Sequence, residues 1–137
     1  MTSPIPGLVI SDATDTNTLA FDLRDVLVAI APKGEGLQWY VRDVDALGQG
    51  AEKLASTAQA RSPLEFESLR DAAQRVNQVI DGQFAGFRGG CLVIAIEAVD
   101  STTYEVYSSD PEILAALRSC FRCVEDAPAR SFDWKPT

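Results

Sequence analysis

Hydrophobic positions along the chain recur with two spacings, and each spacing predicts one kind of element. Between residues 19 and 30, apolar side chains return every three or four positions, which is typical of an amphipathic helix capped among residues 15–17. A second stripe of this kind lies within residues 62–80, behind a capping-box sequence with a proline at the first helical position. A further helix is expected after Asp110-Pro111.

Alternating or continuously apolar segments predict the strands. Residues 37–44 alternate, which indicates a half-buried strand with Tyr40 and Arg42 on the face opposite Trp39. Residues 83–88 and 91–99 flank a Gly-Gly pair that suits a tight hairpin turn. The segment that begins at Cys91 is apolar at both parities, so it is expected in the middle of the sheet with cover on both faces.

The remaining elements complete an α+β domain. Residues 103–108 return as a strand after a three-residue turn, and a last short strand is expected at residues 122–125. The alanine- and glutamine-rich residues 48–61 fit either a short exposed helix or a mobile loop. We therefore expect a mainly antiparallel sheet of four to five strands with two to three helices.

The chain of 137 residues fits one domain, which we place at residues 1–126. Residues 127–137 then form a C-terminal tail that carries Phe132 and Trp134. These two aromatic side chains either pack back on the core or anchor a partner, and the sequence alone does not separate the two possibilities.

Composition excludes several functional classes. The chain has 12 basic and 20 acidic residues, a formal charge of −8, which argues against a nucleic-acid binder. Because it has no histidine, Ser-His-Asp and Cys-His catalysis and the commonest zinc sites are excluded. No sequence fingerprint of a cofactor or metal site is present, and no apolar run is long enough to span a membrane.

Targeting and cysteine usage point to the cytoplasm. The N-terminal residues have neither a basic region nor a long apolar run, so no signal peptide is expected. The three cysteines, Cys91, Cys120 and Cys123, are expected to be reduced thiols in the core. The Cys120–Cys123 spacing falls at a helix C-terminus, where the helix dipole disfavours a reactive thiolate.

One pair of carboxylates carries an enzymatic alternative. Glu97 interrupts an apolar strand, and a three-residue turn at 100–102 would place Glu105 directly opposite it. Two such carboxylates can differ in pKa and act as a general acid and base. Without histidine or a cofactor motif, an enzyme remains the alternative hypothesis, and a homodimeric scaffold is a further one.

Charge supports a protein-binding module as the leading specific hypothesis, although a net negative charge can also serve only to keep a small protein soluble. Acidic residues outnumber basic ones in two segments, residues 97–112 and 12–25, and an acidic face attracts a basic partner. The profile is comparable in size and charge to small cytosolic immunity proteins of bacterial type, which inhibit a basic toxin or effector domain; no motif supports a closer resemblance. The residues expected to contact the partner are Tyr40, Arg42, Asp100, Glu105, Tyr107, Asp110, Glu112 and Trp134.

Overall fold

Six antiparallel strands form a single sheet, and the predicted α+β class is confirmed. The structure is a computed structural model that describes residues 3–16 and 18–134. Its strands are β1 (Ile5–Ile10), β2 (Gln38–Gly48), β3 (Val76–Arg88), β4 (Cys91–Val99), β5 (Thr103–Ser108) and β6 (Val124–Arg130). They lie in the order β2-β3-β4-β5-β1-β6, so β4 takes the central place expected for it.

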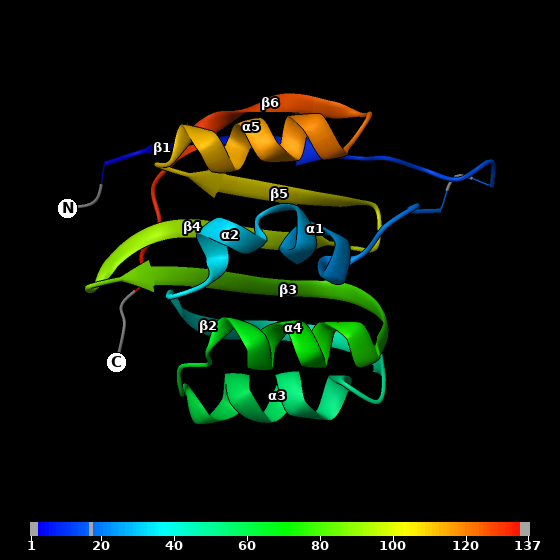
Figure 1. The fold of residues 1–137 in the computed structure, drawn as a ribbon. Helices are drawn as coiled ribbons and strands as arrows, with labels where there is room; N and C mark the ends of the chain where they lie inside the picture. Colours follow the sequence, from blue (N-terminus) through cyan, green and yellow to red (C-terminus); the bar gives the residue numbers. More distant parts are fainter. Residues whose placement is uncertain (1–2, 17, 135–137) are drawn as a thin grey trace.

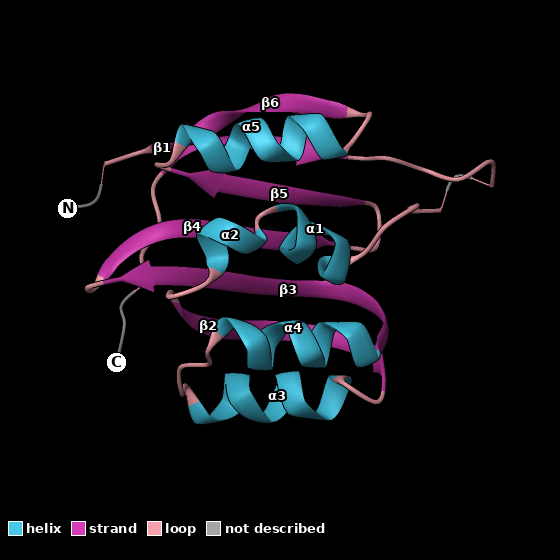
Figure 2. Cartoon of the chain, viewed as in Figure 1, coloured by secondary structure: helices cyan, strands magenta, loops and turns pink. Residues whose placement is uncertain are grey.

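Five helices are found in the described residues, and helices cover one face of the sheet (Figures 1 and 2). They are α1 (Leu23–Ala29), α2 (Ala31–Gly34), α3 (Ala51–Ala60), α4 (Phe66–Arg75) and α5 (Pro111–Cys120). The prediction of four to five strands and two to three helices was therefore slightly low. Residues 48–61, left open between helix and loop, contain α3.

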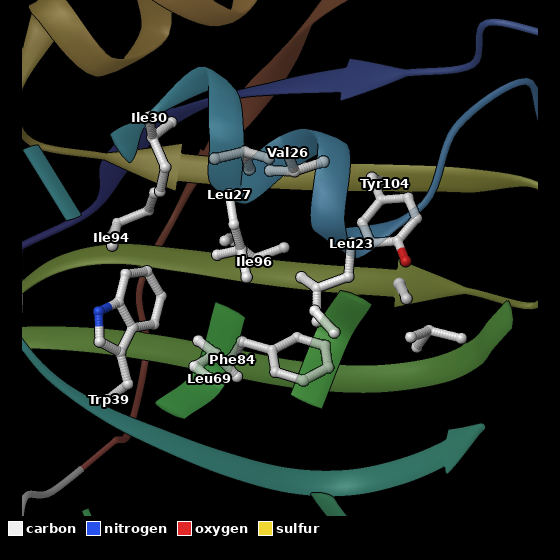
Figure 3. Close-up of a cluster of buried hydrophobic side chains, with 14 of the residues drawn as sticks. Leu23, Val26, Leu27, Ile30, Trp39, Leu69, Phe84, Ile94, Ile96 and Tyr104 are labelled. Atoms are coloured by element: carbon white, nitrogen blue, oxygen red, sulfur yellow. The ribbon is translucent and has the colours of Figure 1, made fainter. Parts of the chain in front are cut away.

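The main core lies between the sheet and the helices (Figure 3). Leu23, Val26, Leu27 and Ile30 extend from the α1 segment toward Ile94, Ile96 and Tyr104 of the central strands. Trp39 of β2 is fully buried in the same cluster, so Tyr40 and Arg42 face the other side, as the alternation predicts. We call the side that packs against the helices the helix face, and the opposite side the distal face.

Two local turns set the register of the central strands as the sequence predicts. Gly89 and Gly90 both adopt positive φ, at 57° and 80°, and connect β3 to β4 in a tight hairpin. Residues 100–102 connect β4 to β5, with Val99 opposite Thr103. Because both turns are short, the pairing of β3, β4 and β5 follows from local sequence.

The boundary between α4 and β3 differs from the prediction. The helix begins at Phe66 rather than behind Ser62, and the chain passes directly into a strand at Val76. The apolar stripe continues to Ile80, but Val76 and Val79 pair with β2 instead of extending the helix. The predicted first helix is likewise shorter, because it begins after Asp22 and not after residues 15–17.

A buried carboxylate contacts both the start of α1 and the first residues of β3. Asp22 caps α1 by accepting the backbone N–H of Leu23 at 2.8 Å, and it also accepts the N–H of Val79 in β3 at 3.1 Å. The Tyr104 hydroxyl of β5 donates to the same carboxylate at 2.5 Å. One side chain therefore fixes the start of α1 and the path of β3 where it leaves α4. Burial, together with the Asp22 carboxylate, raises the pKa of Tyr104 far above its usual range.

Candidate functional site

Within residues 3–16 and 18–134, no helix lies on the distal face, and residues 131–134 run across it instead (Figure 1). β6 extends to Arg130, beyond the last strand expected at 122–125, and residues 131–134 belong to no helix or strand. We call residues 131–134 the strap. Phe132 is only 9% exposed, and Trp134 packs against the apolar side chains beneath it. Of the two possibilities left open for these aromatic residues, the structure has them packed back on the sheet.

The two carboxylates predicted to face each other do so. Glu97 of β4 and Glu105 of β5 are register partners on the distal face, with side chains 25% and 26% exposed. Arg130 approaches both: its Nη2 lies 3.3 Å from Glu97 Oε2 and its Nη1 lies 3.9 Å from Glu105 Oε1. A cation between two like charges removes the repulsion that would otherwise destabilise this strand pair.

The environment of Arg130 is partly aromatic. Its guanidinium lies 4.8 Å from the Phe132 ring centroid and 5.6 Å from that of Tyr107. The Tyr107 hydroxyl donates to Glu105 Oε1 at 2.7 Å, which fixes that carboxylate. Burial and this hydrogen bond raise the pKa of Tyr107. Partial burial would lower the pKa of Arg130, but Glu97 and the Tyr107 hydroxyl outweigh it, and the net shift is upward.

A second arginine lies at the other end of the strap. Arg42 of β2 donates from Nε to Gln83 Oε1 at 2.6 Å and from Nη2 to Asp133 Oδ1 at 3.1 Å. Its guanidinium stacks 4.0 Å from the Trp134 ring centroid. An arginine therefore lies at each end of the strap, and each arginine forms an ion pair with a carboxylate and packs against an aromatic ring.

Tyr40 and Tyr107 were expected to be accessible to a partner, and here the structure corrects the expectation. Both side chains face the distal side, but they are only 5% and 3% exposed. Tyr40 packs with Phe87, while the Tyr107 ring lies 5.2 Å from that of Phe132. Alternation along a strand predicts which face a side chain takes, but a segment distant in sequence decides whether that face is open.

Three exposed carboxylates gather at the end of the distal face that the strap leaves open. Asp45 of β2 and Asp81 of β3 are register partners, and Asp81 Oδ1 accepts the backbone N–H of Asp100 at 2.9 Å. Each of the three is exposed, and no ion pair to a described residue is found for any of them. We call Asp45, Asp81 and Asp100 the acidic corner.

The other predicted acidic residues do not extend this corner. Asp110 and Glu112 follow β5, at the end opposite Asp100, and both pair with Lys33 of α2 at 3.5 and 2.6 Å. Asp110 also caps α5 by accepting the N–H of Glu112, as the sequence predicts. The acidic stretch of residues 97–112 is thus divided among two ends and one face of the sheet.

The acidic residues near the N-terminus have structural partners. Asp12 accepts the backbone N–H groups of Arg122 and Cys123, and Asp25 accepts the N–H of Asp22 at 2.8 Å. With Asp22 buried, three of the four acidic residues in this segment hold backbone donors. The segment therefore contributes little to an open anionic surface.

The three cysteines are exposed, which contradicts the expected core thiols. Cys91 opens β4 directly after the Gly-Gly turn, and Cys120 is the last residue of α5. They were expected in the core because the sequence indicated no redox or zinc site, but each thiol lies at or beyond the end of an element, where the opposing layer no longer covers it. No group of three or more side chains suited to hold a metal ion is found among residues 3–16 and 18–134.

Two features of this face were missed by the sequence analysis. The acidic corner depends on pairing between β2 and β3, which are separated by two helices, so no local signal shows it. Arg130, in contrast, has a readable signal: Arg130, Phe132 and Trp134 are spaced two apart, the period of an extended segment with one side on a surface.

The described helices include none that is both long and apolar enough to cross a membrane. Comparisons of the chain with protein-family models, curated proteins and solved structures found no match of any of the three kinds.

Proposed function

We propose that this protein is a binding module for a basic protein, which docks on the distal face over the acidic corner. The observation that carries the proposal is the charge of this uncovered area. Asp45, Asp81 and Asp100 are exposed there, whereas Glu97 and Glu105 on the same face are paired with Arg130. The nearest cations on this face, Arg42 and Arg130, are already engaged in ion pairs.

Electrostatic attraction is the physical basis of the proposal. A group of carboxylates on one face of a protein of charge −8 raises the association rate of a basic partner and orients it. An inhibitor of a cationic enzyme, such as a toxin nuclease domain, is the role that this charge fits best, because its surface would replace the enzyme's anionic substrate. Screening by salt should weaken the interaction.

The test compares captured proteins. Tagged wild-type protein and a variant with Asp45→Lys, Asp81→Lys and Asp100→Asn are used to capture proteins from the source organism, at low and at high salt. Asparagine is chosen at residue 100 because Asp100 has a positive φ of 48°, which asparagine tolerates. We expect one basic protein to be captured by the wild type at low salt and to be lost in the variant.

A control variant carries the same change of net charge elsewhere. Glu35→Lys, Glu52→Lys and Glu65→Gln alter exposed residues of the helical segments, away from the sheet. This control should retain the captured protein, and both variants should melt cooperatively. Equal capture by all three proteins, or equal loss in both variants, would refute docking at the acidic corner.

A further inference from the structure

The strap fills a site whose chemistry can be read from its own contacts. None of the described helices covers the distal face, so the strap shields the apolar patch beneath it, which contains Tyr40, Ala85, Phe87, Ala95 and Tyr107. The strap follows Arg130, the last residue of β6, and ends at Trp134, near Arg42 at the β2 edge of the sheet. It therefore occupies the position that an extended peptide ligand would take on this sheet.

The first subsite recognises a guanidinium. Glu97 and Glu105 face each other on adjacent strands, which is unfavourable unless a cation lies between them. Arg130 supplies that cation, and Tyr107 holds Glu105 in place through its hydroxyl. A planar guanidinium can hydrogen-bond both carboxylates and stack on an aromatic ring, which a lysine ammonium does less well.

The second subsite recognises aromatic rings. Phe132 packs edge-on against Tyr107, and Trp134 contacts the cluster of Tyr40, Phe87 and Leu92. The spacing of Arg130, Phe132 and Trp134 matches an extended chain whose alternate side chains point down into the sheet.

Hollows on both sides of the strap leave room for a longer segment. One, of about 330 Å³, is lined by Ile5, Phe87, Leu92, Phe132 and Trp134 among others. The other, of about 660 Å³, lies between β2, α3 and the strap, and its lining includes Arg42, Ala58 and Trp134. Short segments outside the main hydrogen-bonded elements open at a lower free energy than the core strands.

We propose that the strap is an internal ligand, and that the basic partner displaces it with an extended segment carrying an arginine followed at alternate positions by aromatic residues. This inference rests on the proposed function and names the chemistry of its partner. The acidic corner then attracts the partner, while the site under the strap selects the segment that binds. In the unbound protein the strap shields the aromatic patch from solvent.

The test uses a labelled, amidated peptide of residues 128–134, Pro-Ala-Arg-Ser-Phe-Asp-Trp, with the full-length chain. In the wild type the strap competes with the peptide, so binding should be weak. In the Arg130→Gln/Phe132→Ala/Trp134→Ala chain both subsites are vacated, because Arg130 no longer pairs with Glu97 and Glu105, and we expect the Kd to fall by about tenfold or more. The same peptide with glutamine in place of arginine should lose about tenfold in affinity, because the carboxylates lose a charged partner.

Two matched variants of the vacated chain locate the binding site. Glu97→Gln/Glu105→Gln should abolish the preference for the arginine peptide, whereas Asp45→Asn/Asp81→Asn removes the same charge and should retain it. If the vacated chain does not melt cooperatively, Arg130→Gln in the full chain replaces it in every comparison.

Several outcomes would overturn the proposal: no binding to the vacated chain, equal affinity for both peptides, or equal loss in the two matched variants. A wild-type dimer that dissociates on Phe132→Ala/Trp134→Ala would assign the site to the strap of a second copy, and would also overturn it. Failure here with the acidic-corner test intact would leave the proposed function standing, because that test does not depend on the strap.

Discussion

Replacing Tyr104 with phenylalanine tests how much the buried Asp22 network contributes to stability. The Tyr104 hydroxyl lies 2.5 Å from Asp22 Oδ1, and the two side chains are 0% and 8% exposed. A hydrogen bond to a charged acceptor contributes about 1.5–3 kcal/mol. Asp22 keeps its backbone donors in Leu23 and Val79, so Tyr104→Phe should lose about 2 kcal/mol near neutral pH and still fold.

The pH dependence gives this prediction a second, sharper readout. The pKa of Tyr104 is raised in the folded protein, so its contribution is complete below the pKa of the unfolded tyrosine, about 10, and is lost as the pH rises above that value. Each pH unit above 10 should then cost the wild type about 1.4 kcal/mol that the variant does not lose. The two stabilities should converge near about pH 11 to 12.

Urea unfolding followed by tryptophan fluorescence, from about pH 7 to about pH 12, measures both quantities. Tyr107→Phe serves as a comparison, because the Tyr107 hydroxyl also donates to a carboxylate. Its acceptor, the side chain of Glu105, is 26% exposed and therefore less buried than Asp22. We expect this variant to lose less than about 1.5 kcal/mol at neutral pH. Parallel curves for wild type and Tyr104→Phe across the whole pH range would refute the reasoning, as would an unchanged stability at pH 7.

Two further predictions concern packing and exposure. Gly50 has ordinary helical backbone angles, but a Cβ there would lie 2.1 Å from the carbonyl oxygen of Ala72. Gly50→Ala should therefore lower the free energy of unfolding, measured by urea titration, by about 1–3 kcal/mol. An unchanged urea midpoint would contradict the close approach of α3 and α4. The exposed thiols of Cys91, Cys120 and Cys123 should all react with an aromatic disulfide reagent in the native protein, and a thiol that reacts only in denaturant would show that it is buried.

Sequence patterns predicted the central part of the sheet because its information is local. The turn between β3 and β4 needs two residues with positive φ, and Gly89-Gly90 provides them. The next turn has three residues, so the register from Glu97 to Glu105 follows by counting. Where short turns connect neighbouring strands, side-chain pairs across the sheet can be derived from sequence alone.

The failures occur where distant segments decide the structure. The helical stripe from Leu69 to Ile80 continues without interruption, yet the strand begins at Val76 because Asp22 binds the N–H of Val79 and Arg24 donates to the carbonyl of Val76. Helical periodicity contains no information about these two contacts, because each joins residues more than 50 positions apart in the sequence.

β1 was missed for a related reason. Its Pro6 and Gly7 are unfavourable in strands, and the sequence gives no sign that the segment lies between β5 and β6. The structure shows why glycine is suitable: a Cβ at Gly7 would lie 2.2 Å from the Tyr107 ring, and the register with β6 shifts between Ile5 and Gly7. Residues that weaken a strand by propensity here permit the close packing of the distal face.

The two parts of the distal face should respond differently to salt, and this difference separates attraction from selection. Exposed carboxylates such as Asp45 and Asp81 act through solvent, and their effect falls as the Debye length shortens from about 10 Å at 0.1 M salt to about 3 Å at 1 M. Contacts made under the strap against Tyr107 and Phe87 bury apolar surface, which salt does not weaken. Raising the salt concentration should therefore slow association more than it speeds dissociation. If salt raised the dissociation rate by the same factor by which it lowered the association rate, the partner would have no anchor on the aromatic patch. The acidic corner alone would then account for its affinity.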